Sequence, residues 1–127
     1  MPLRFRSDNK PVVEFDPRLE ISPFTLFRRL REGHDLLLVD VRSAPAGRTL
    51  RGSCRLPGPD WEPDENQEVL LFDEEGTAAV DLAQNLLARG HSAVRALFGG
   101  LQLYEFSLDP EVVGEETFLV PIDEISS

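Results

Sequence analysis

Residues 69–88 have the sequence VLLFDEEGTAAVDLAQNLLA, and this stretch decides the fold. Its first four residues are all apolar, which is typical of a short strand buried on both faces. From Thr77 onward apolar residues recur at helical spacing, and Gly90 is a typical helix stop. Between strand and helix lies a tight acidic turn, Asp73–Gly76. A buried strand that leads directly into a helix is one step of an alternating strand–helix fold. The helical apolar positions are Val80, Ala83, Leu86 and Leu87.

Two further apolar runs flank this stretch. Residues 36–41, LLLVDV, predict a second buried strand, and residues 93–97 predict a third. A short strand is also expected near residues 53–56. Because strands alternate with helices, we expect a parallel sheet with helices on both faces. The predicted fold class is therefore three-layer α/β with a central parallel sheet flanked by helices.

Two more helices complete this pattern. Ser22 followed by Pro23 predicts a helix start, because serine caps the first turn and proline suits the first helical position. This helix is expected to end at Gly33. A second, short helix is expected to follow the glycine pair at residues 99–100 and to end before residues 109–110. The residues expected on the buried face of the first helix are Phe24, Phe27 and Leu30.

The length of 127 residues predicts a single domain, 1–127, with a core of about 18–108 and an acidic C-terminal tail, 109–127. The one cysteine, Cys54, excludes an internal disulfide framework and a multi-cysteine zinc site. No apolar run approaches the ~20 residues of a membrane span, so no membrane contact is expected. The N-terminal arginines precede no apolar segment, which argues against a signal peptide. We therefore expect a cytoplasmic protein.

Charge is distributed unevenly along the chain. Residues 1–55 carry a net charge of +4, and residues 56–127 carry −14. Residues 56–88 hold nine acidic side chains and no basic one. Such negative potential repels nucleic acid and anionic metabolites. We therefore expect no nucleic-acid partner and an acidic surface around the turn at residues 73–76.

Motifs along residues 21–106 resemble, in order and at similar spacing, those of the rhodanese-like domains. Residues 21–23, ISP, with the helix behind them resemble the opening helix of that family, and residues 38–42, LVDVR, resemble its Asp-Val-Arg strand end. Residues 49–57, TLRGSCRLP, resemble the family segment His-Ile-Pro-Gly-Ala-Ile-Asn-Leu-Pro. The family ending is matched by Gly90, Val94, Leu97 and the glycine pair at 99–100. The resemblance implies the same three-layer fold.

In that family a cysteine opens the loop after the fourth strand. Backbone N–H groups of the loop stabilise its thiolate or persulfide, and the sulfur passes to a thiol or cyanide. In this chain Asp73 stands at the position of that cysteine, and a carboxylate cannot carry a persulfide. Glu74 and Glu75 stand where the family often has basic side chains. The resemblance therefore implies a member that lacks the catalytic cysteine and is not an enzyme.

Inactive domains of this family resemble regulatory or docking modules. We accordingly expect a binding or regulatory module that meets a protein partner through its acidic loop face, with no cofactor and no metal. Asp40 and Arg42 are expected to support the site, with Arg42 bracing the loop that follows its strand. The expected binding-loop residues are Asp73, Glu74, Glu75, Gly76, Thr77 and Ala78.

The resemblance also suggests what Asp73 does. A loop of the family's shape points several N–H groups at one spot beside a helix N-terminus, and such a concavity holds an anion. We expect the carboxylate of Asp73, or secondarily that of Glu74, to turn inward and fill it. The site would then be occupied by the chain itself.

Other functions remain open for the same loop. Asp73 would act as base or nucleophile in a phosphatase-like enzyme, because residues 70–77 are similar to the Asp-x-Asp-Gly-Thr motif of haloacid-dehalogenase-type phosphatases, with Glu75 as the departure. Residual sulfur transfer is a further enzymatic alternative. The three adjacent carboxylates are also candidates for Mg²⁺ or Ca²⁺, although consecutive residues of a tight loop rarely converge on one ion.

Three features outside the loop carry hypotheses of their own. Cys54 is expected to be buried, because the family position it matches faces the core, and to act as a small hydrophobe. Trp61 is a candidate for a contact surface or for packing over the sheet edge. The acidic tail is a candidate docking arm within a larger complex.

Overall fold

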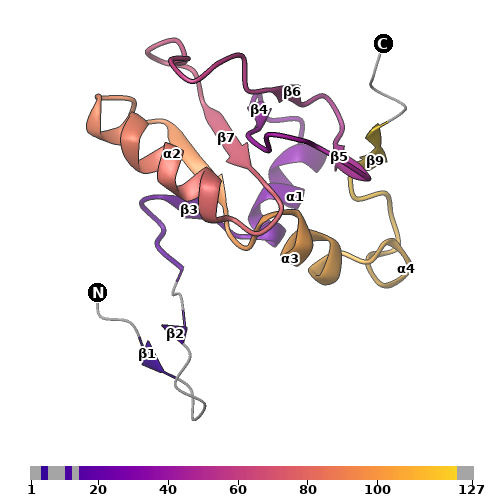
Figure 1. Cartoon of the computed structure of the whole chain (residues 1–127). Helices are drawn as coiled ribbons and strands as arrows, with labels where there is room; N and C mark the ends of the chain where they lie inside the picture. Colours follow the sequence, from indigo (N-terminus) through magenta and orange to yellow (C-terminus); the bar gives the residue numbers. More distant parts are fainter. Residues whose placement is uncertain (1–3, 6–10, 13–14, 123–127) are drawn as a thin grey trace.

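A five-stranded parallel sheet forms the centre of the fold (Figure 1). The computed structural model describes residues 4–5, 11–12 and 15–122. Every neighbouring pair of strands in the sheet is parallel, which confirms the prediction. In spatial order the strands are β3 (Glu20–Ile21), β8 (Val94–Leu97), β7 (Val69–Phe72), β4 (Leu37–Asp40) and β6 (Cys54–Arg55).

Helices cover both faces of this sheet, so the predicted three-layer α/β class is confirmed (Figure 1). One face is covered by α2 (Thr77–Ala88), and the other by α1 (Pro23–Arg31) and α3 (Gly100–Ser107). Successive side chains of a strand point to opposite faces. In β7, Val69 and Leu71 therefore face α2, whereas Leu70 and Phe72 face the other two helices. Two apolar layers explain why β7 has no polar residue.

The start of α1 follows the prediction, but its buried face differs. The backbone N–H of Thr25 donates to the Ser22 hydroxyl at 3.2 Å, as expected of a helix cap. Phe24, however, is 61% exposed, so its predicted burial is wrong. The helix instead packs on the sheet through residues spaced three and four apart, and Phe24 lies one position off that stripe. The stripe consists of Pro23, Leu26, Phe27 and Leu30.

Residues 109–122 fold onto the domain instead of forming a free tail. After α4 (Pro110–Val113), strand β9 (Leu119–Pro121) pairs antiparallel with β5 (Arg48–Leu50). The hydroxyl of Tyr104 donates to the carbonyl of Thr117 at 2.5 Å, and burial raises the pKa of this phenol. The remainder of the predicted tail, residues 123–127, lies outside the described residues.

Near the N-terminus, β1 (Arg4–Phe5) pairs antiparallel with β2 (Pro11–Val12). Within the described ranges, none of the helices is both long and apolar enough to span a membrane.

Candidate functional site

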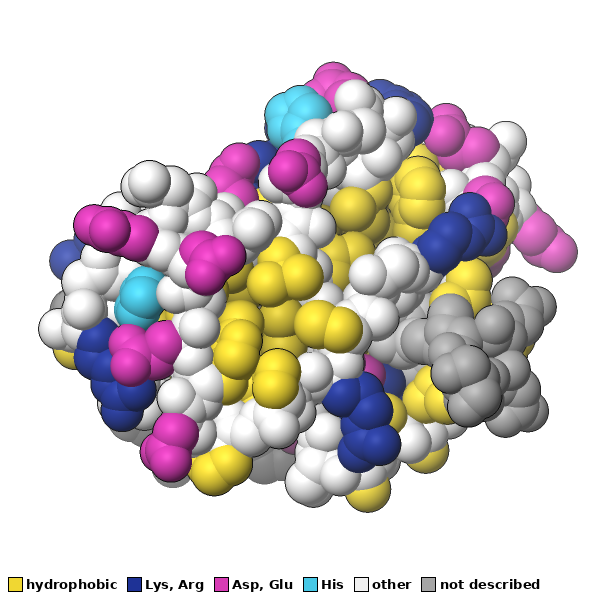
Figure 2. Space-filling model, turned by 90° about the horizontal axis from the view of Figure 1, so that it is seen from above, with side chains coloured by type: hydrophobic (Ala, Val, Ile, Leu, Met, Phe, Trp, Pro, Cys, Tyr) yellow, Lys and Arg dark blue, Asp and Glu magenta, His cyan; other side chains and the backbone are white. Residues whose placement is uncertain are grey.

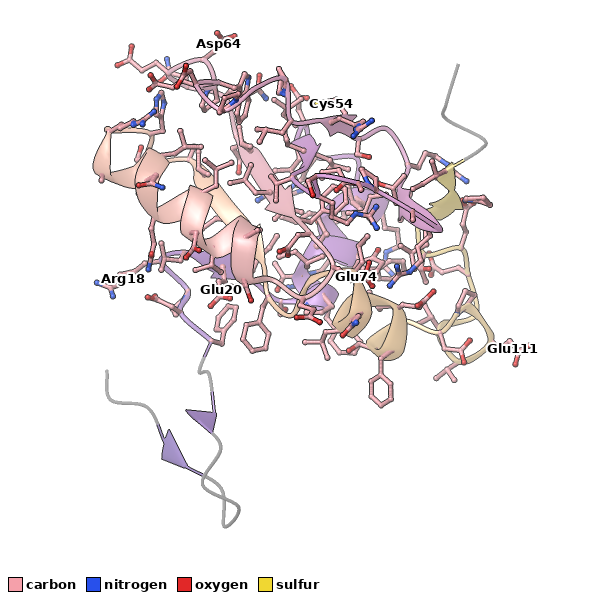
Figure 3. The ribbon with its side chains drawn as sticks, viewed as in Figure 1. Arg18, Glu20, Cys54, Asp64, Glu74 and Glu111 are labelled. Atoms are coloured by element: carbon pink, nitrogen blue, oxygen red, sulfur yellow. The ribbon has the colours of Figure 1, made fainter. Side chains whose placement is uncertain are left out.

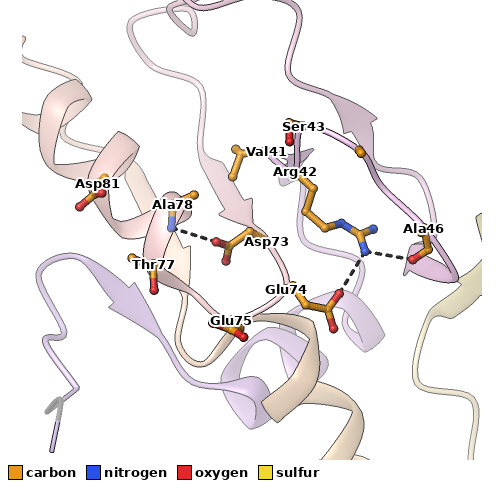
Figure 4. A pocket seen from close by; sticks show the side chains of 11 residues that line it. Val41, Arg42, Ser43, Ala46, Asp73, Glu74, Glu75, Thr77, Ala78 and Asp81 are labelled. Carbon is orange, nitrogen blue, oxygen red and sulfur yellow. Dashed lines mark hydrogen bonds and ion pairs between the residues drawn. The ribbon is translucent and has the colours of Figure 1, made fainter. Parts of the chain in front are cut away.

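The carboxyl ends of β4 and β7 meet at a hollow of about 650 Å³ (Figure 4). Ligands of parallel α/β sheets bind at this edge. The loop after β4 forms one wall and the turn between β7 and α2 forms the other. Of the eight residues predicted for the site, six line the hollow, Gly76 lies within the turn, and Asp40 is buried beneath Arg42. The six are Arg42, Asp73, Glu74, Glu75, Thr77 and Ala78.

Asp73 points into the turn, with only 7% of its surface exposed. The backbone N–H of Gly76 donates to Oδ1 at 2.5 Å. The backbone N–H of Ala78 donates to Oδ2 at 2.9 Å (Figure 4). The second bond satisfies an N–H in the first turn of α2, which has no capping side chain at Gly76 itself. This confirms the expected inward carboxylate. The anion-binding concavity of the loop is filled by the chain's own side chain.

Backbone hydrogen bonds from the start of α3 hold the same turn in place. The backbone N–H of Leu101 donates to the carbonyl of Asp73 at 2.9 Å, and that of Gln102 donates to the carbonyl of Glu74 at 3.0 Å. Gly100 makes this approach possible, because a Cβ there would lie 2.5 Å from the Glu74 carbonyl oxygen. Sequence reasoning identified this glycine as a turn but not as the contact that holds the loop.

Glu74 is not a free acidic group. Its carboxylate accepts two hydrogen bonds from Arg48, at 3.0 and 2.9 Å. A third comes from Arg42 at 3.3 Å (Figure 4). The hydrogen bonds from Arg48, with a smaller contribution from Arg42, lower the pKa of Glu74. The acidic stretch itself contains no basic residue, but the fold brings two arginines from elsewhere in the chain to Glu74. Both arginines come from the β4–β5 segment, far from the acidic stretch in the sequence.

Asp40 and Arg42 form the support that the resemblance implied. The guanidinium of Arg42 contacts both oxygens of Asp40, with Nη2 at 2.7 Å from Oδ2, and this pairing raises the pKa of Arg42. Its remaining donors reach the backbone carbonyls of Ala46 at 3.2 Å and Arg48 at 2.7 Å. The hydroxyl of Thr49 donates to Asp40 as well. Arg42 therefore braces the loop after β4, as expected.

The outward side chains of the site are Glu75, Thr77, Ala78 and Asp81, all of them exposed. Of these, Glu75 and Asp81 give the rim its negative charge. The end of the molecule that carries Asp64 lies away from the site (Figure 3), and seen from above it shows a central group of apolar side chains with Asp and Glu side chains spread around it (Figure 2). On that face the acidic residues do not gather into one patch.

Cys54 and Trp61 lie away from the hollow. Cys54 is exposed, so its predicted burial is wrong, because β6 is an edge strand and both of its residues are exposed. It lines a separate hollow of about 300 Å³ with Thr49 and Ser53. Trp61 is half-buried and packs against the core on the α2 side of the sheet, which favours packing over a contact surface.

The part of the chain that the structure describes contains no group of three or more His, Cys, Asp or Glu side chains placed to hold a metal ion. The three consecutive carboxylates of the turn point in different directions. Asp73 faces the turn, Glu74 faces two arginines, and Glu75 is exposed.

No protein-family model matches this sequence. No curated protein matches it either. Solved structures do match. A rhodanese homolog from Thermus thermophilus is 28% identical, with a TM-score of 0.52, over 66% of this chain and 98% of that one. A rhodanese-related protein from Thermoplasma volcanium is 14% identical, with a TM-score of 0.56, over 80% and 97%. A Lactobacillus plantarum protein is 21% identical, with a TM-score of 0.58, over 70% and 83%.

The class that the fold and these likenesses define is a small α/β domain with a five-stranded parallel sheet between helical layers. The fold of the chain is rhodanese-like. Its loop between β7 and α2 contains no cysteine, and its single cysteine, Cys54, lies on β6.

Proposed function

We propose that this rhodanese-like domain has no sulfur-transfer activity and works as a binding or regulatory module. One observation carries the proposal. The two oxygens of the Asp73 carboxylate accept the N–H groups of Gly76 and Ala78, which in an active relative would face the sulfur anion. The site already holds an anion that cannot be transferred. We also expect this module to act in the cytoplasm.

The position of Cys54 supports the same proposal. In the sheet order, β4 lies between β7 and β6, so the thiol is on a different strand from the loop and lines a different hollow. None of the N–H groups that bind Asp73 is available to stabilise a thiolate there. The exposed position of Cys54 therefore does not reproduce the loop in which the family holds its sulfur anion.

The rim of the hollow supports a protein partner. Glu75, Thr77, Ala78 and Asp81 are exposed there, on a loop fixed by α3 and by the two arginines. A rigid loop binds with a smaller entropic cost than a mobile one. This exposed rim is the acidic loop face of the proposal.

The geometry does not favour the enzymatic alternative. A nucleophilic or basic carboxylate must reach a substrate, but Asp73 is 7% exposed and both of its oxygens accept backbone hydrogen bonds. Each bond uses one lone-pair position of its oxygen and holds the carboxylate inward, away from a substrate. Asp73 is therefore better suited to holding the loop than to attacking a substrate.

Transfer of sulfur from thiosulfate to cyanide tests the proposal. The full chain and its Cys54→Ala variant should both form thiocyanate no faster than heat-inactivated protein. Turnover that the Cys54→Ala change abolishes would show that Cys54 is the active thiol. Turnover that survives this change would show a sulfur-transfer route without any cysteine. Either result would refute the proposed inactivity.

A further inference from the structure

A further cavity lies on the other side of the turn, between β3 and the first turns of α2. Its volume is about 430 Å³, within the range of roughly 300–1,000 Å³ common for ligand sites. Four carboxylates line it, and none of the described side chains in its wall is basic. Its wall also contains the aromatic ring of Phe98. The carboxylates belong to Asp16, Glu20, Glu75 and Asp81.

Glu20, labelled in Figure 3, is the buried member of this set, because only 6% of its surface is exposed. The backbone N–H of Asp16 donates to its Oε1 at 2.9 Å, and no hydrogen bond from any described residue reaches its other oxygen. A buried carboxylate without a counter-ion is costly unless something compensates its charge. Burial accordingly raises the pKa of Glu20, and the neighbouring Asp16 carboxylate adds to this rise.

The other three carboxylates leave the cavity negative. Asp16 is paired with Arg18, whose side chain is 88% exposed and lies outside the cavity wall. Glu75 and Asp81 are exposed, and neither has a cationic partner among the residues that the structure describes. The described residues offer no cluster suited to a metal ion. The cavity therefore suits an organic cation that is long enough to reach Glu20.

We propose that this cavity binds a lysine or arginine side chain of a protein partner. The cationic end pairs with Glu20 at the bottom, and the carboxylates of Glu75 and Asp81 draw it in at the mouth. The ring of Phe98 adds an apolar wall for the methylene stem and attracts the cation. This proposal rests on the proposed binding function, since Glu75 lines both the hollow of the site and this cavity. It adds the chemistry of the partner, a cationic side chain.

Amide NMR of the full chain tests this directly. The probes are N-acetyl-lysine methylamide and N-acetyl-arginine methylamide, and the neutral control is the norleucine analogue. The two cationic probes should shift the amides of Glu20, Gly76 and Gly99 in a saturable way, and the norleucine analogue should not. Glu20→Gln should weaken binding by at least about tenfold, because it removes the buried charge. Glu65→Gln, an exposed acid outside the cavity wall, should leave binding unchanged.

A second readout works even if the Glu20→Gln protein fails to fold. The side-chain carboxyl carbon of Glu20 in the wild-type chain should titrate at lower pH with the lysine probe present than without it. Shifts equal to those of the norleucine analogue, or an unchanged Glu20 titration, would overturn the proposal. Tighter binding of the lysine probe to the Lys10→Gln variant than to the wild-type chain would also overturn the proposal, because the chain's own lysine would then occupy the cavity.

This test and the sulfur-transfer assay can fail separately. Probe binding together with sulfur transfer would refute the inactive role and leave the cavity proposal intact. An absence of both would refute only the cavity proposal.

Discussion

Asp73 satisfies two backbone N–H groups that would otherwise have no partner in the turn and in the first turn of α2. Removal of such a capping side chain usually costs about 0.5–2 kcal/mol. We therefore expect Asp73→Ala to lower the free energy of unfolding by that amount in urea denaturation. The neighbouring change Glu75→Ala, at an exposed side chain, is the control and should stay within about 0.5 kcal/mol of wild type. Equal effects of the two changes would show that Asp73 does not cap the turn.

The ionised side chain of Glu20 should destabilise the fold, whereas the carboxylate of Asp73 stabilises it. The pKa of Glu20 is raised by burial, so the stability of the fold decreases as pH rises from the ordinary glutamate pKa through the raised value. Glu20→Gln keeps the acceptor for the Asp16 N–H but cannot become charged. The variant should therefore melt at a higher temperature than wild type at pH 7, and the difference should close at acid pH. A variant less stable at pH 7 would reveal a favourable partner for the carboxylate.

At the scale of elements, Glu74 connects the turn after β7 to the β4–β5 segment through Arg42 and Arg48. Its pKa is lowered by these arginines, so its stabilising contribution is present above the ordinary glutamate pKa and is lost as pH falls through the lowered value. Glu74 is 39% exposed, and partly exposed pairs contribute about 0.2–1 kcal/mol. Glu74→Gln should cost about that much at pH 7 and nothing at acid pH.

Urea denaturation at both pH values checks this prediction, with Glu75→Gln as the matched control. Glu75 neighbours Glu74 and has no cationic partner among the described residues. A cost for Glu74→Gln that persists unchanged at acid pH would contradict an ionic origin.

Local sequence patterns were sufficient for the central elements. The continuous apolar runs of β4 and β7 reflect strands that are buried on both faces. The helical spacing of apolar residues in α2 reflects burial along one stripe of the helix. In each case the pattern lies within the segment itself. The same holds for the Ser22 cap of α1. The inward carboxylate of Asp73 was predictable from the resemblance to the rhodanese-like domains, which implies a loop whose N–H groups point at one spot.

Features that depend on distant residues were not predictable in this way. Arg48 meets Glu74 across 26 residues, and nothing in either local pattern indicates the pair. The pairing of β5 with β9 likewise depends on the return of the chain after α4. Cys54 was misplaced because two residues of strand do not reveal whether the strand lies at an edge. Phe24 was misplaced because a helix of nine residues fits more than one apolar stripe.

At the scale of the whole molecule, the chain after residue 108 closes the fold. Val120 on β9 is 5% exposed, whereas Val112 on α4 is 83% exposed. Val112 is therefore the exposed control for a substitution at the buried Val120. Val120→Ser should lower the free energy of unfolding by about 1.5–3 kcal/mol, and Val112→Ser by less than about 0.5 kcal/mol. Thermal and urea unfolding of both variants provide the check. If this segment were a detached docking arm, neither change would matter.

Charge pairing between the two halves of the chain stabilises the acidic loop of the site. Arginines of the first half, which carries +4, reach the loop of the second half, which carries −14. They neutralise Glu74 and leave Glu75 and Asp81 on the rim. The central claim is therefore that the anion-binding turn of this rhodanese-like fold is filled by its own Asp73.

Binding of thiosulfate, followed through the backbone amide resonances of Gly76 and Ala78, tests that claim most directly. In the wild-type chain these two resonances should not move as thiosulfate is added, because their N–H groups already donate to Asp73. In Asp73→Ala they should move in a saturable way, since the vacated turn can hold an external oxyanion. Saturable movement in the wild-type chain, with the same affinity as in the variant, would contradict the account.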